Sequence, residues 1–161
     1  MTPATTAAPD PAEATATVTA ETYAQVLQFY AHHMQLLDAG AAEEWADGFT
    51  EDGVFAQNVK PEPWTGRTHI ATSMRRGLAR LAERGVQRRH WLSMVVAEPA
   101  PADAAGETYD EAVRTRYYAV VFETPRGGQA SVYLSTTGED LLVRRGAQWF
   151  IRHRLISHDG V

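Results

Sequence analysis

One histidine and one aspartate in this chain have the residue types and the expected placement for proton transfer near neutral pH. His90 lies in the stretch QRRHWLSMVVAE, whose alternation predicts a strand in which His90, Leu92 and Met94 share one apolar face. A buried histidine needs a hydrogen-bond partner. Asp38 is available for this role, because it ends the first predicted helix on that helix's inward face. A carboxylate beside an imidazole fixes its tautomer, and such a pair suits general acid–base chemistry.

Other side chains are expected to line the same site. Tyr30 lies two turns before Asp38 on the same helix face, and Tyr117 has the alternation expected of a pocket wall. His153 is expected to line the pocket or its mouth from the last strand, and Trp64 to lie at the mouth in a proline-rich loop. Each of these residues could instead serve only in packing. His90 could likewise be an ordinary core histidine, and Asp38 could simply bond the backbone at the end of its helix.

The sequence predicts no metal site. It contains no cysteine, which excludes thiolate ligands and cysteine nucleophiles. His32 and His33 are adjacent in a predicted helix and point roughly 100° apart, so they cannot chelate one ion together. A triad of His90, His153 and Asp38 is geometrically conceivable, but nothing in the spacing supports it.

The composition indicates one globular domain that binds neither nucleic acid nor membranes. The chain has 161 residues, of which 44% are hydrophobic, and it can bury a sizeable core. The net charge is −5, and the 15 basic residues, Lys60 and otherwise arginines, are interleaved with acids. Such interleaving forms no basic block for nucleic acid. No apolar run reaches the length of a membrane span.

The order of predicted elements favours an α+β fold. Residues 1–19 are rich in Ala, Thr and Pro, which predicts a disordered tail. This tail does not have the pattern of a secretory signal, so we expect a cytoplasmic protein. We expect a single domain over residues 20–161. Three helices are predicted first. Antiparallel strands follow at about 88–98, 111–124, 129–137 and 149–157, with an interruption near TTGED where we expect a bulge or kink. Helices followed by such a meander are typical of α+β domains, with the helices packed on one face of the sheet.

The second face of the predicted sheet also carries large apolar side chains. Trp91, Phe122 and Phe150 alternate there with arginines, a mixture that suits contact with another sheet better than open water. We therefore expect a homodimer that forms through the outer sheet face.

Five motifs in a fixed order resemble a known family. LLDAG ends the first helix, EEWADGFTEDGVF follows, WTGRTHI opens the third helix, RRHW opens a strand, and GAQWFIRHRLISHD closes the chain. Over about residues 20–159, the chain resembles the SnoaL-like family of the nuclear-transport-factor-2-like superfamily, also called scytalone dehydratase-like or cystatin-like. The resemblance implies an α+β cone: three N-terminal helices packed on a curved antiparallel sheet that encloses an apolar pocket. It also implies chemistry on small apolar molecules without a metal or an organic cofactor.

The resemblance implies roles for individual residues. Asp38 and His90 occupy the positions of the acid–base pair in the scytalone dehydratase branch, but Leu37 stands where that branch has a tyrosine. The second catalytic histidine of that branch has no clear counterpart in RYYAVVFETP. The hydroxyl that polarises the substrate would therefore come from another tyrosine, for example Tyr30, Tyr117 or Tyr133.

The expected function is cofactor-independent acid–base catalysis in secondary metabolism, such as antibiotic biosynthesis. The reaction would cyclise or dehydrate a polyketide-like or aromatic intermediate. Two alternatives remain open at this stage: an enzyme that opens an epoxide, and a protein that binds a small molecule without turnover, since this fold carries many functions.

Overall fold

The structure is a computed structural model that describes residues 16–161. Its elements, in chain order, are α1 Ala20–Asp38, α2 Ala42–Ala46, β1 Phe49–Gln57, β2 Trp64–Thr65, α3 Arg67–Glu83, β3 Val86–Pro99, the short 3₁₀ helix η1 Ala102–Ala104, β4 Glu111–Pro125, β5 Ser131–Arg145 and β6 Gln148–His158. The tail predicted at 1–19 lies mainly outside the described residues. The predicted succession of helices followed by long strands is confirmed.

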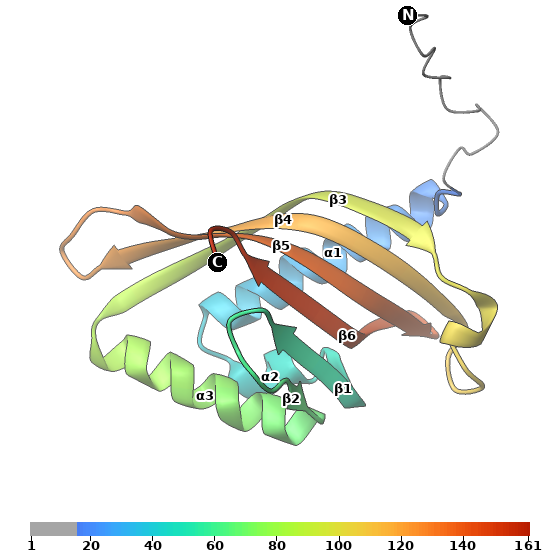
Figure 1. The fold of residues 1–161 in the computed structure, drawn as a ribbon, viewed down its shortest axis with the longest axis horizontal. Helices are drawn as coiled ribbons and strands as arrows, with labels where there is room; N and C mark the ends of the chain where they lie inside the picture. The colour runs from blue at the N-terminus through green and yellow to red at the C-terminus, as the bar shows by residue number, and fades with distance from the viewer. Residues whose placement is uncertain (1–15) are drawn as a thin grey trace, which may run out of the picture.

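One open, six-stranded sheet forms the main layer of the fold. The strand order is β2-β1-β6-β5-β4-β3. Figure 1 shows the long curved sheet with α1 running along one face and with α2 and α3 on the same side. The predicted α+β cone is confirmed, with one difference: β1 pairs parallel with β6, whereas the other neighbours are antiparallel. The helices and the concave side of the sheet therefore enclose the space in which a site can form.

Helix α1 has well-defined ends that place Asp38 at its last turn. The side chain of Thr19 accepts a hydrogen bond from the backbone N–H of Thr22 at 3.1 Å and so caps the N-terminus. Gly40 follows the helix with φ of 81°, a left-handed conformation that glycine adopts without strain. The helix packs across β3, which brings its last turn beside the strand that carries His90.

An irregularity in β3 reverses the expected alternation. The register with β4 shifts between Ser93 and Val96, and Met94 has φ of 54°. A bulge of this kind adds a residue to one strand and turns the following side chains to the other face. Met94 is therefore 72% exposed, whereas Val95 is buried. The prediction that Met94 shares the inward face of His90 is wrong for this reason.

A second irregularity changes the inward residues of β6. The register between β5 and β6 shifts between Leu141 and Leu142, opposite Ile151 and His153. Past this point His153 is exposed, and Arg154 is buried instead. Strand β5 continues through TTGED without a break, and the bulge or kink predicted near that stretch is this register shift, which directly follows it.

The core fills the space between α1, the short helix α2 and the inner sheet face. Its fully buried side chains include Val26, Tyr30, Trp45, Phe49, Ile70, Leu142 and Ile151. Among the described helices, none is long and apolar enough to cross a membrane.

Candidate functional site

The inner face of the sheet, α1 and α3 surround an open cavity of about 660 Å³. This volume lies within the usual range for sites that bind drug-sized molecules. Aromatic and aliphatic side chains from several elements form its walls, among them Phe55, Trp64, Leu78, Leu92 and Tyr117. The cavity is therefore suited to a flat, largely apolar ligand.

His90 and Asp38 meet at the wall of this cavity. The imidazole Nδ1 lies 2.6 Å from Asp38 Oδ1, and the backbone N–H of His90 donates to Asp38 Oδ2 at 3.1 Å. An ionised carboxylate only accepts hydrogen bonds, so Nδ1 carries the proton. The other ring nitrogen, Nε2, bonds to no described residue. The pair thus has the arrangement of a general base with its orienting carboxylate.

The position of Asp38 is secured by neighbouring groups of β3. The side-chain amide of Gln87 donates to the backbone carbonyl of Asp38 at 2.9 Å, which ties the end of α1 to the strand. Both carboxylate oxygens bond His90 rather than the backbone of the turn. The side chains of Asp38 and His90 are 10% and 21% exposed, so little solvent competes with their contact.

Two of the three predicted tyrosines line the cavity, and the third lies outside it. Tyr117 lines the cavity, whereas Tyr30 is buried and borders a smaller hollow of about 480 Å³ between α1 and β3. That hollow is also bordered by His90 and Asp38. Tyr133 lines the cavity while 48% exposed, with the guanidinium of Arg88 4.2 Å from the centre of its ring.

The hydroxyl groups of Tyr30 and Tyr117 are both committed to a buried acid. Tyr30 donates to Asp140 Oδ2 at 2.8 Å and also contacts the hydroxyl of Thr115, and Tyr117 donates to Asp140 Oδ1 at 3.2 Å. Burial raises the pKa of both phenols well above the ordinary value, and the Asp140 carboxylate raises it further. Tyr117 therefore contributes its ring to the cavity wall while its proton is held by Asp140.

A buried ion pair, absent from the sequence-based expectations, borders the cavity through its arginine. Arg154 Nε lies 2.9 Å from Asp140 Oδ1, and Nη2 lies 2.7 Å from Oδ2. The side chains are 3% and 0% exposed. Burial acts to lower the pKa of Arg154, but the Asp140 carboxylate and Tyr117 raise it, and the net shift is upward. Arg154 thus stays charged, and it lines the cavity.

The remaining predicted site residues lie in different surroundings. Trp64 lines the cavity and packs on Phe55 with ring centres 5.3 Å apart, but it belongs to the short strand β2 rather than to a loop. Met94 and His153 do not line it, because the two strand irregularities turn them outward. His158, which the sequence reasoning missed, lines the cavity instead, with Nε2 3.2 Å from Gln57 Oε1.

His33 lies outside the cavity and has a structural environment. Its Nε2 donates to the backbone carbonyl of Trp45 at 2.8 Å, and its ring stacks on the indole. Burial, and then the charge of Arg154, lower the pKa of His33 well below its ordinary value. Across residues 16–161, no three His, Asp or Glu side chains cluster in a way that could hold a metal ion.

The chain belongs to the SnoaL-like family. The model of the SnoaL-like domain matches residues 18–155, which is most of the chain. This match agrees with the resemblance noted in the sequence and with the α+β cone. No protein with a curated function matches the chain.

Several solved structures with the same fold come from actinomycetes. Aln2 from a Streptomyces species is 30% identical, with a TM-score of 0.77, over 89% of this chain and 94% of Aln2. ActVI-ORFA from Streptomyces coelicolor is 28% identical, with a TM-score of 0.76, over 88% and 99%. A protein from Catenulispora acidiphila in complex with S-DNPA is 35% identical, with a TM-score of 0.70, over 88% and 96%.

Proposed function

We propose that this protein is a cofactor-independent acid–base enzyme that cyclises or dehydrates a polyketide-like or aromatic intermediate. The contact of 2.6 Å between His90 Nδ1 and Asp38 Oδ1 at the wall of an apolar cavity carries the proposal. The family and the neighbouring structures support it, because one neighbour binds the small molecule S-DNPA.

The reaction begins with transfer of a proton from carbon to His90. Nε2 takes a proton from a carbon next to a substrate carbonyl, which leaves an enolate and an imidazolium that Asp38 stabilises. In cyclisation, the enolate carbon bonds to a second carbonyl carbon, whose oxygen takes the proton back from Nε2. In dehydration, the enolate expels a hydroxyl group, which leaves as water with that same proton.

The enolate oxygen needs a hydrogen-bond donor, and we assign this role to Arg154. Tyr117 holds its proton toward Asp140, so it is a poor donor to a substrate. Arg154 uses Nε and Nη2 for Asp140, while Nη1 donates to no described residue. A fixed cation that borders the cavity stabilises developing negative charge without having to reorganise.

The scarcity of carboxylates around the cavity favours this chemistry over epoxide opening. Opening an epoxide with water needs one acid to protonate the oxygen and one base to activate the nucleophile. Among the described residues that line the cavity, Asp38 is the sole carboxylic acid, and it is bonded to His90. One dyad is sufficient for enolisation, in which a single group removes and returns the proton.

The proposal is tested by deuterium exchange into a carbon acid that fits the cavity. β-Tetralone, a small aromatic ketone, is incubated with the protein in deuterium oxide and followed by proton NMR. We expect exchange next to the carbonyl with the wild type and a loss of about 10²-fold or more in His90→Ala. His153→Ala is the matched control, because this histidine is exposed and lies outside the cavity. Equal ligand binding by wild type and His90→Ala without exchange by either would establish a binding protein instead.

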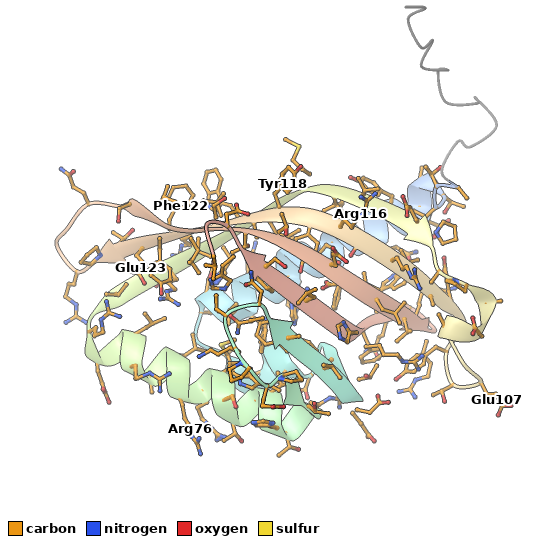
Figure 2. All side chains as sticks on the ribbon, viewed as in Figure 1. Arg76, Glu107, Arg116, Tyr118, Phe122 and Glu123 are labelled. Carbon is orange, nitrogen blue, oxygen red and sulfur yellow. The ribbon has the colours of Figure 1, made fainter. Side chains whose placement is uncertain are left out.

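We also propose that the protein forms a homodimer through the outer face of the sheet. Trp91, Tyr118 and Val132 are 67%, 62% and 62% exposed. Trp91 packs on Phe122 with ring centres 5.3 Å apart, and Figure 2 shows Tyr118 and Phe122 on the side of the sheet away from α3. Exposed aromatic clusters of this kind mark contact surfaces.

Light scattering after size exclusion tests the dimer. We expect a dimer for the wild type and a monomer for Trp91→Glu that is still folded by circular dichroism. A wild-type monomer at micromolar concentration would overturn the proposal.

A further inference from the structure

The rim of the cavity carries positive charge that no acidic side chain balances. Lys60, in the loop after β1, and Arg80 and Arg84, at the C-terminal end of α3, all line the cavity. None of the three lies within ion-pair distance of a described carboxylate. By contrast, the deeper cationic residues are paired, Arg88 with Glu123 at 2.7 Å and Arg154 with Asp140.

This positive rim stands out because the protein as a whole is acidic. The chain has a net charge of −5, yet Asp38 is the one carboxylate among the described residues that line the cavity, and it is bonded to His90. Arg80 and Arg84 are one turn apart on α3, so their like charges repel. The negative end of the helix dipole accounts for part of this arrangement, since it favours cations in the last turn. It does not account for Lys60, which comes to the same rim from a different element.

We propose that the ligand of this cavity is an organic acid, whose carboxylate binds Lys60, Arg80 and Arg84 while its apolar rings reach His90. This inference rests on the proposed function, because it names the substrate class for the same site. Arginine and lysine form strong, charge-assisted hydrogen bonds with carboxylates. Anchoring an anionic group at the rim also sets how deep the ring system lies in the cavity, and hence which carbon faces Nε2.

Two fluorescent probes with the same aromatic rings separate charge recognition from apolar binding. Anilinonaphthalene sulfonate carries a negative charge, whereas phenylnaphthylamine is neutral. Both are titrated against the wild type, the triple variant Lys60→Gln/Arg80→Gln/Arg84→Gln and the control Arg76→Gln. Arg76 belongs to α3 but does not line the cavity, and Figure 2 shows it pointing away from the sheet.

We expect the triple variant to bind the anionic probe about tenfold more weakly, at about two- to threefold for each exposed cation. Its affinity for the neutral probe should stay within about twofold, and so should the affinity of Arg76→Gln for both probes. Wild-type affinity for the anionic probe should also fall as salt is added. Displacement by naphthoate, but not by naphthamide, would extend the result from a sulfonate to a carboxylate.

Two results would overturn the inference. An unchanged affinity for the anionic probe would mean that the three cations do not bind an anion, and equal losses for both probes would mean that the substitutions damage the cavity. Neither result depends on turnover. Conversely, His90→Ala should abolish proton exchange and leave the preference for the anionic probe intact, so failure of the proposed function is recognised separately.

Discussion

Replacing Asp140 with asparagine should strongly destabilise the fold, because it removes the counter-ion of a buried cation. Asp140 accepts four hydrogen bonds, two from Arg154 and one each from Tyr30 and Tyr117. An asparagine side chain has one acceptor oxygen and an amide group that would face N–H and O–H donors. The change therefore leaves Arg154 charged, buried and unpaired.

The size of the effect follows from the burial of the pair. Removing one partner of a buried ion pair typically costs about 3–5 kcal/mol, against a total stability of about 5–15 kcal/mol for an ordinary domain. The two side chains here are 3% and 0% exposed, so solvent does not screen the loss. For a domain of this length, the expected fall in melting temperature is about 6–20 °C.

Urea denaturation and thermal unfolding followed by circular dichroism measure the loss. The control is Glu98→Gln, which removes the partner of Arg116 on the surface at 3.5 Å and should cost less than about 1 kcal/mol. The double variant Asp140→Leu/Arg154→Met removes both charges and should be more stable than Asp140→Asn. A cost for Asp140→Asn no larger than that for Glu98→Gln would refute the reasoning.

Further predictions concern two glycines and one titrating group. In Gly138→Ala the new methyl would lie 2.1 Å from Tyr117 Cε2, so we expect a cost of about 1–3 kcal/mol in urea denaturation. Gly77→Ala, with no neighbour nearer than 4.0 Å inside α3, should instead stabilise by about 0.5–1 kcal/mol. The pKa of His33 is lowered by burial, so stability should fall as pH drops below about 6.5, by up to about 1.4 kcal/mol per pH unit. His33→Phe removes the one proton that His33 would take up on unfolding, so the dependence of stability on pH should become weaker by that amount. An unchanged dependence would contradict the assignment of this effect to His33.

The contact between His90 and Asp38 could be predicted from the sequence, because each residue comes before any irregularity in its helix or strand. Asp38 follows from the helical spacing of α1, and His90 lies four residues before the bulge at Met94. Alternation remains valid over that segment. The positions of Met94 and His153 could not be predicted by the same reasoning, because a bulge shifts all later side chains without leaving a distinct mark in the sequence.

The buried ion pair was missed for the same reason. Regular alternation from an inward His153 would turn Arg154 outward, and the register shift in β6 reverses this. Asp140 lies in the stretch TTGED, where the sequence predicts an interruption. In the sheet, Asp140 lies directly between its cross-strand neighbours Thr115 and Arg154. The alternation of Thr136, Gly138 and Asp140 was an available signal, since all three are inward and buried.

A double-mutant cycle on deuterium exchange tests most directly whether His90 and Asp38 act as one proton-transfer unit. The rate next to the carbonyl of β-tetralone is measured for wild type, His90→Ala, Asp38→Asn and the double variant. If the pair acts as a unit, each single variant loses most of the rate and the double variant is no slower than His90→Ala. Losses that add in free energy, or an Asp38→Asn rate equal to wild type, would contradict the account.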